Sequence, residues 1–304
     1  MANQVPTWFV TKFTTEVEYK VQQMPARFWE ASEIRSESGS GAVAVEQIGA
    51  TNASVVTGRL QPIVFTDTPQ DRRWVYPQKL WWADAVDTYE KLEVSIDPQG
   101  FFAKNATYAL NRQKDDIWIS SFFGTAQTSN ASTTGNAPAT AVPFPAGQVV
   151  SVNTGSSGGA TPVGMNVPKL RAARLLMLSA EVDFDNETPY AGMSAQQMDN
   201  MLNQAQAISL DFNDKPVLVE GKITSFMGFQ FLHSERMPLN ASAQRQCPVW
   251  VKSGMRGAVW QDVSTDIRQR EDLIGLPYQV SAQMMVGATR LQEPKCVSIP
   301  CTEP

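Results

Sequence analysis

One long helical pattern, between Asp97 and Gly124, constrains the fold of this chain more than any other stretch. Asp97 suits an N-cap, Pro98 suits the first helical position, and Gly124 is placed to end the helix in the left-handed conformation. Apolar residues repeat on one face and polar residues on the opposite face: Phe102, Ala106, Ala109, Leu110 and Ile117 against Lys104, Asn111, Arg112 and Asp115. Such a helix is about 39 Å long, roughly twice the average in globular proteins. It predicts either a long core helix of an enzyme domain or a spine that sets the length of an elongated subunit.

The composition is that of an ordinary globular protein of one large or two smaller domains, with 304 residues, 42% hydrophobic and 18% charged. The net charge of −5 argues against a general nucleic-acid binder. No apolar run is long enough to span a membrane, and the N-terminus lacks the pattern of a signal peptide. Three cysteines, Cys247, Cys296 and Cys301, make a disulfide framework improbable and favour a reducing cytoplasm.

The N-terminal segment carries an apolar stripe at Phe9, Phe13, Val17 and Val21, spaced four residues apart. This spacing predicts a short amphipathic helix that ends before Pro25. Phe28 and Trp29 add a second apolar patch. A helix this short is not stable alone, so we expect it to dock on a neighbouring subunit or on the long helix.

Residues 36–72 alternate glycine and proline with short β-prone runs, AVAV, ASVV and PIVFT. We expect strands of an extended hairpin, which has too few large apolar residues to build its own core and so lies on another surface. Three tryptophans lie close together after this hairpin, and we expect them to be buried together where it joins the rest of the chain: Trp74, Trp81 and Trp82.

After Gly124, a Thr-, Ser- and Gly-rich stretch runs to Gly164, and we expect it to be a long surface loop. Pro168 opens a helix, TPYAGM suggests a strand, and Ser194 with Gln197 matches a capping box that starts another helix. After Pro216 most apolar runs favour strands. This order of elements predicts an α+β architecture.

The catalytic inventory is thin, and we expect no catalytic residue, cofactor site or metal site. His233 is the one histidine, lies on an expected strand and has no nucleophile motif nearby. Cys296 and Cys301 lack the further ligands of a zinc site. The alternating acids of EVDFDNET, Asp183, Asp185 and Glu187, lack the spacing and glycine of a calcium loop.

Four segments together resemble the major capsid proteins of tailed bacteriophages, which have the Hong Kong 97-type fold. They are DRRWVYPQKLWWADAVD, EKLEVSIDPQGFFAKNATYALNRQKDDIWISSFFGTA, GKITSFMGFQFLHSERMP and YQVSAQMMVGATRLQEPKCVSI. No single motif is specific, but their order and spacing are those of the family, over roughly residues 70–125 and 165–301.

The resemblance implies an α+β Hong Kong 97-type fold in five parts. These are an N-terminal arm (1–35), an extended hairpin arm or E-loop (36–78), a peripheral domain (79–165) with the spine helix at 98–123, an axial domain (166–285) and a C-terminal return (286–304).

The implied function is that of a major capsid protein of the virion. Copies would assemble as pentamers and hexamers, in the host bacterial cytoplasm, into an icosahedral shell around double-stranded DNA. The implied partners are other copies, a portal protein, an optional decoration or cement protein, and DNA held non-specifically on the inner face. The N-terminal helix starts close to Met1, so we expect no large propeptide and a separate scaffolding protein. The alternatives are another virion component, such as a tail protein, or a hydrolase that uses His233.

Contacts between subunits are expected at nine residues: Phe9, Phe13, Val17, Val21, Ile48, Val55, Phe65, Arg72 and Arg73. In some relatives a lysine of the arm forms an isopeptide bond with a neighbour. This chain has no lysine between Lys20 and Lys79, so its arm must hold a neighbour by strand pairing, apolar contacts and ion pairs.

Overall fold

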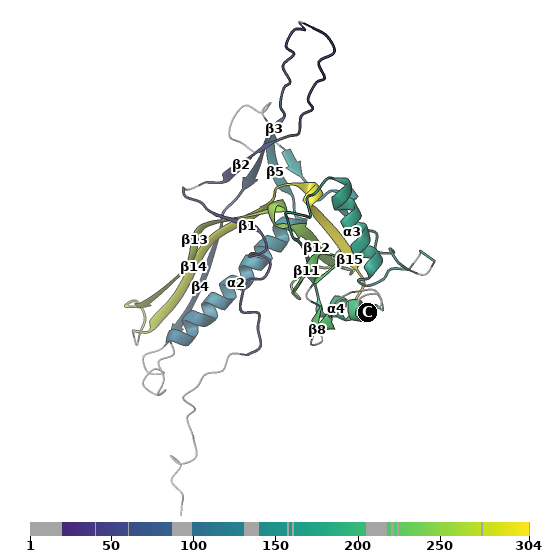
Figure 1. Ribbon diagram of the computed structural model, residues 1–304. Coiled ribbons are helices and arrows are strands. Elements are labelled where there is room, and N and C mark those ends of the chain that lie inside the picture. Colours follow the sequence, from purple (N-terminus) through teal and green to yellow (C-terminus); the bar gives the residue numbers. More distant parts are fainter. Residues whose placement is uncertain are drawn as a thin grey trace, which may run out of the picture. The chain divides into compact units, whose positions relative to one another are not determined.

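The computed structural model describes residues 20–39, 41–59, 61–86, 99–130, 140–156, 158–159, 161–204, 218–219, 222–223, 225–274 and 276–303 (Figure 1). These fall into two compact units. The smaller comprises Lys79–Lys114, Gln261–Met285 and the described part of Met1–Ala26; the larger comprises the described parts of Arg27–Gln78, Asp115–Trp260 and Val286–Pro304. Phe9, Phe13, Val17 and the expected N-cap Asp97 lie outside the described residues.

The smaller unit combines most of β4 (Gln78–Val86), the first part of α2 (Gln99–Phe123) and the outer parts of β13 (Met255–Gln269) and β14 (Tyr278–Arg290). Residues 20–26 are hydrogen-bonded to α2. Arg112 Nη1 donates to Gln22 Oε1 at 2.6 Å, and Asn111 Nδ2 donates to the Met24 carbonyl at 3.1 Å. The described part of the N-terminal segment therefore has a partner on the long helix.

Helix α2 confirms the expected spine helix, but its end differs from the prediction. Gly124 does not have a positive φ, so the expected left-handed conformation is wrong. Its N–H donates to the Ser120 carbonyl at 2.8 Å, and a Cβ at this position would lie only 2.4 Å from that oxygen. Glycine is required here because the preceding turn approaches too closely for a side chain.

We expect Gly124→Ala to lower the free energy of unfolding by about 1–3 kcal/mol, because the added methyl group must displace the helix end. Urea denaturation of the unassembled subunit measures this. Gly147→Ala is the matched control, since a Cβ there meets nothing within 4 Å. Equal stability of the two variants would contradict the steric argument.

The larger unit includes two sheets of four and five strands, the helices α3 and α4, and the C-terminal part of α2 (Figure 1). The first sheet has the order β2-β3-β5-β6 and is antiparallel, and the second has the order β10-β11-β7-β12-β15. The bounds are β2 Val43–Ile48, β3 Gln70–Val75, β5 Ala126–Asn130, β6 Thr140–Val142, β7 Pro189–Met193, β10 Ser225–Phe226, β11 Phe229–His233, β12 Arg245–Val251 and β15 Cys296–Cys301. The helices are α3 Val167–Ser179 and α4 Ala195–Leu202.

A further sheet has the order β1-β13-β14-β4, in which β1 (Glu33–Ser36) runs parallel to β13 from Glu33↔Arg256 to Ser36↔Val259. Two short strands, β8 (Leu218–Val219) and β9 (Lys222–Ile223), pair with each other. Single-turn 3₁₀ helices lie at Ala146–Gln148, Lys252–Gly254 and Glu293–Lys295.

The helices and strands expected after Pro168 are confirmed, whereas three expectations in the first half are wrong. The runs at 53–56 and 62–66 are not strands, because no described segment pairs with them. The stretch from Gly124 to Gly164 includes β5 and β6, and β5 pairs with β3. Trp74 is buried as expected, but Trp81 is 62% exposed, so the three tryptophans are not buried together.

The core of the larger unit is an aromatic cluster. The rings of Trp118 and Trp250 lie 4.5 Å apart, and Phe28 stacks on Trp118 at 5.2 Å. Trp250 Nε1 donates to the Ala31 carbonyl at 2.9 Å, so the buried indole has its hydrogen bond. Phe28 therefore finds its partner in its own chain.

Asp115 was expected on the polar face of the long helix, and the structure corrects this, because Asp115 is fully buried. Its carboxylate accepts from the backbone N–H groups of Arg27 at 2.9 Å, Phe28 at 3.1 Å and Trp29 at 3.4 Å. Three donors explain how a carboxylate is tolerated inside the protein.

Candidate functional site

The hairpin arm has a paired base and an unpaired end. Strands β2 and β3 pair from Val43↔Val75 to Ile48↔Gln70, and the Gly49 N–H donates to the Pro69 carbonyl at 2.8 Å. Residues 50–68, here the distal arm, continue beyond this last bond and form no strand in their described part. In Figure 1 the distal arm is the loop that projects beyond β2 and β3.

A buried ion group fixes the base of the arm to its own unit. Arg73 Nη2 lies 2.8 Å from Glu293 Oε2, and the fully buried Arg290 lies 3.5 Å from the other oxygen of Glu293. Arg290 also donates to the carbonyls of Phe122 at 2.5 Å and Gly124 at 3.1 Å. Burial lowers the pKa of Arg290, but arginine starts so high that it stays charged. Glu293 and Arg290 were not singled out from the sequence, because only the fold brings them to Arg73.

Arg72 is also engaged within the chain. It lies opposite Glu46 in the β2–β3 ladder, and their charged groups are 2.5 Å apart. Its guanidinium sits 5.7 Å from the ring of Trp74, whose Nε1 donates to Ser129 Oγ at 3.1 Å. A contact of Arg72 or Arg73 with a neighbouring subunit stays a prediction.

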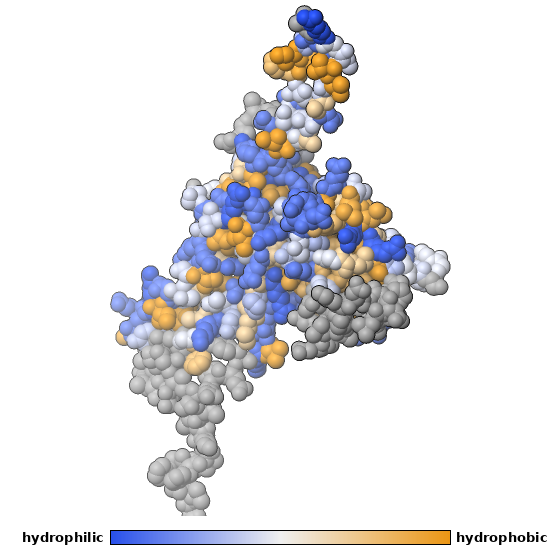
Figure 2. All heavy atoms as spheres, in the orientation of Figure 1, coloured by the Kyte–Doolittle hydropathy of each residue, from blue (hydrophilic) through white to orange (hydrophobic). Residues whose placement is uncertain are grey.

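The distal arm and its approach expose large apolar side chains. Ile48, Val55 and Phe65 are 78%, 85% and 90% exposed. Three further side chains of the runs VV and IVF, which were not predicted as contact residues, are equally exposed: Val56, Ile63 and Val64. Figure 2 shows hydrophobic surface, in orange, near the end of the arm just below a hydrophilic tip. Val21, in the N-terminal segment, is fully exposed as well.

This arrangement suits binding rather than chemistry. A firmly held two-stranded base carries an end whose described apolar side chains are all exposed. Within this end, Gln61 Nε2 donates to Thr57 Oγ1 at 2.9 Å. Exposed apolar side chains concentrated in one segment mark a contact surface for another molecule.

His233 has the surroundings of a structural residue. Its Nδ1 lies 2.9 Å from Arg27 Nη1 and its Nε2 lies 3.0 Å from Glu235 Oε1. It borders a cavity of about 600 Å³ together with Met198, Leu202 and other residues. Both ring nitrogens are occupied by charged partners, and neither partner is a serine, threonine or cysteine that the imidazole could activate.

We expect His233→Ala to assemble as the unchanged chain does. The substitution removes two hydrogen bonds at a half-exposed side chain, at a cost of about 1–2 kcal/mol. Particle yield by electron microscopy, compared with the unchanged chain, checks this. Loss of all particles from a variant that still folds would give His233 a larger role.

The described residues contain no group of three or more His, Cys, Asp or Glu side chains arranged to hold a metal ion. Cys247, Cys296 and Cys301 are free and buried, and burial raises the pKa of the Cys296 thiol, so it stays protonated. Asp183 accepts from the N–H groups of Asp185 and Asn186 in its own turn. Among the described helices, none combines the length and apolar character needed to cross a membrane.

Comparisons with known proteins give a consistent result. A family model described as phage capsid protein matches residues 5–303. No curated protein matches the sequence.

Solved capsid structures resemble the whole chain. The capsid of cyanophage P-SCSP1u has a TM-score of 0.72 at 14% identity, over 100% of this chain and 97% of its own. The capsid of Ralstonia phage GP4 has a TM-score of 0.72 at 10% identity, over 100% of this chain and 98% of its own. The capsid of cyanophage Pam1 has a TM-score of 0.69 at 13% identity, over 99% of both chains. At these identities the likeness establishes a shared α+β fold.

Proposed function

The chain belongs to the phage capsid protein family, and from that premise we propose that the hairpin arm of each copy binds a neighbouring copy in the shell. The chain is a major capsid protein, a structural component of the virion that associates with copies of itself and is not an enzyme. Family membership decides against both alternatives, a tail component and a hydrolase. The observation that carries the proposal is the exposure of Ile48, Val55 and Phe65 on a base held by Arg73 and Glu293.

An arm with exposed apolar side chains is stabilised when a partner covers them. Each large apolar side chain contributes about 1.5–3 kcal/mol when it is fully buried. The described part of the distal arm buries almost none of this area in its own chain. Contact with a second copy would bury it, and repetition around a closed shell would multiply a modest contact.

The proposal also covers how the copies are arranged in the shell and which parts of the chain play which role. Copies form pentamers and hexamers of an icosahedral shell with the Hong Kong 97-type fold, assembled in the host cytoplasm on a separate scaffolding protein and joined by a portal protein. The parts are the N-terminal arm (1–35), hairpin arm (36–78), peripheral domain (79–165), axial domain (166–285) and C-terminal return (286–304). The two compact units divide the chain at other positions, so this division is a proposal about roles.

The packaged double-stranded DNA would meet the inner face non-specifically. A net charge of −5 supports weak rather than tight contact, because tight binding of phosphates needs clustered cations. The remaining contact residues of the proposal are Phe9, Phe13, Val17 and Val21 of the N-terminal arm, with Arg72 beside Arg73 at the base of the hairpin arm.

Electron microscopy of the purified protein, with and without a co-expressed scaffolding protein, tests the proposal. Uniform closed shells are expected. Tubes or compact small oligomers under both conditions would contradict it.

The shells are expected to be held without covalent links between arms. The hairpin arm contains no lysine, and arginine stays protonated and cannot act as the amine nucleophile. Arg72 already pairs with Glu46 of its own chain, and any exposed ion pair that it made with a neighbouring subunit would contribute at most about 1 kcal/mol. Apolar contacts or a cement protein must therefore supply the rest.

Denaturing electrophoresis of mature particles after boiling with reductant should therefore give one band near 33.4 kDa. A ladder of multimers that resists reductant would contradict this expectation. Purified monomer run beside the particles provides the size control.

A further inference from the structure

Helix α3 carries apolar side chains on the face that it turns to solvent. Arg171, Leu175 and Leu178 follow the i, i+4, i+7 spacing of a single helix face. Leu175 is 67% exposed and Leu178 is 47% exposed. The opposite face, with Leu170 and Met177, is already buried in the larger unit. The exposed face therefore has apolar area that no described residue covers.

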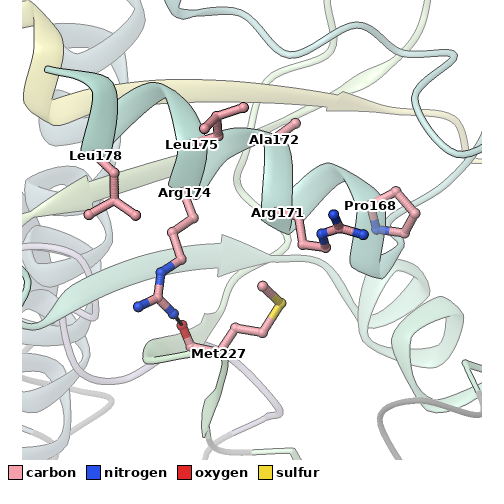
Figure 3. A pocket seen from close by; sticks show the side chains of 7 residues that line it. All are labelled: Pro168, Arg171, Ala172, Arg174, Leu175, Leu178 and Met227. Atoms are coloured by element: carbon pink, nitrogen blue, oxygen red, sulfur yellow. Dashed lines mark hydrogen bonds between the residues drawn. The ribbon is translucent and has the colours of Figure 1, made fainter.

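Arg171, Leu175 and Leu178 line a groove of about 580 Å³ together with Met227, and in Figure 3 the Arg174 side chain reaches from the helix toward Met227. Arg174 Nη1 donates to the Met227 carbonyl at 2.7 Å, and its guanidinium lies 5.6 Å from the ring of Phe184. Arg174 is thus held in place. Arg171 is exposed and forms no ion pair with another described residue. The groove combines two leucines with a positive charge one to two turns away.

The distal arm carries two apolar side chains and one acidic side chain that complement the leucines and the arginine of α3. Ile63, Phe65 and Asp67 are two residues apart, so in an extended chain they point to one side. Ile63 and Phe65 are 84% and 90% exposed, and Asp67 is exposed without an ion pair to a described residue. The series ends in the charge opposite to that of Arg171.

The lengths of the two series also agree. From residue 63 to residue 67 an extended chain spans about 13 Å. From Arg171 to Leu178 the helix rises about 10.5 Å, and the arginine side chain can reach across the difference. Laid in opposite directions, Ile63 meets Leu178, Phe65 meets Leu175 and Asp67 meets Arg171.

We propose that the distal arm of one copy docks in the α3 groove of a neighbouring copy, with Phe65 on Leu175 and Asp67 beside Arg171. This inference rests on the proposed function, that the arm binds a neighbour, and adds the surface that receives it. Phe65 gains an apolar contact, and Asp67 and Arg171 each gain an opposite charge. The charge pair sets the direction of docking, and the apolar contacts supply most of the binding free energy.

A cysteine pair tests the docking directly. Shells of the F65C/L175C variant, treated with diamide, should give multimers on non-reducing gels that collapse to monomer with reductant. The three native cysteines are buried and add little background. The matched control is V64C/L175C, because Val64 points to the other side of an extended chain. We expect about tenfold less cross-linking in the control, since disulfides tolerate only a narrow range of Cβ separations.

A charge-reversal series gives a second readout without cysteines. D67R and R171D should each reduce shell yield, and the D67R/R171D double variant should restore it. Should F65C/L175C fail to assemble, this series decides alone. Normal shells with no F65C/L175C cross-link above the control would overturn the docking site while leaving the proposed function intact, as would absence of rescue in the double variant. No shells from the unchanged chain, under any condition, would instead overturn the proposed function.

Discussion

Shortening the distal arm should abolish shell formation while leaving the subunit folded. In this variant an Asn-Gly turn replaces residues 50–68 and joins Gly49 to Pro69, whose backbone hydrogen bond of 2.8 Å already closes the ladder. The segment removed forms no strand and supplies no residue to the core in its described part, so the free energy of unfolding should change by less than about 1 kcal/mol. The shortened chain lacks the exposed apolar surface that a neighbouring copy would cover.

Sedimentation velocity and electron microscopy of the same preparation measure both halves of this prediction. The expected result is a well-folded monomer or small oligomer and no closed shell. The control keeps the arm at full length and replaces the polar Asn52 and Ser54 with alanine, which should leave the shell yield unchanged. Normal shells from the shortened chain would refute the role given to the arm.

Replacement of Asp115 should destabilise the subunit more than any other single substitution considered. Asp115→Ala leaves the buried N–H groups of Phe28 and Trp29, and the half-buried N–H group of Arg27, without their acceptor. An unmade hydrogen bond of a buried group costs about 1–3 kcal/mol, so the sum is on the order of 3–5 kcal/mol once partial relaxation is allowed. That is a large share of the stability of an ordinary domain.

Urea denaturation of the unassembled protein, followed by tryptophan fluorescence, measures the loss. Asp116→Ala is the matched control, because Asp116 is adjacent but about one-third exposed and pairs with Arg236 at the surface. The control should cost at most about 1 kcal/mol. Similar midpoints for the two variants would show that the backbone donors find water or another acceptor.

Local patterns in the sequence were sufficient to predict where the described helices begin. The cap residues Asp97 and Pro98 predict the start of α2 to within two residues, and Pro168 predicts the start of α3 to within one, because a helix satisfies its backbone within itself. The capping residue Ser194 was also predicted, and its Oγ accepts from the Gln197 N–H at 3.4 Å. The side chain of Gln197 does not complete the box, because it accepts from the Met165 N–H and donates to the Thr302 carbonyl.

Features that depend on partners distant in the sequence were not predictable. Asp115 has the sequence neighbours of a solvated residue, and only the return of residues 27–29 to α2 buries it. The β-prone runs near Val55 and Phe65 do favour extended backbone, but a strand also needs a second strand beside it. The composition of the arm indicated that it lacks a core of its own, which is why the contact residues could be proposed before the surface that receives them.

The position of β15 has a consequence for the timing of folding. All six residues of this strand are buried, and it pairs with β12 from Arg245↔Cys301 to Trp250↔Cys296. Lys169, also fully buried, donates to the Pro300 carbonyl at 2.8 Å, so α3 depends on the same strand. A nascent chain still lacking residues 296–301 cannot close this sheet, and its contacts are non-local, which slows folding further. We therefore expect this sheet, and the packing of α3 against it, to be completed only after synthesis has passed β15.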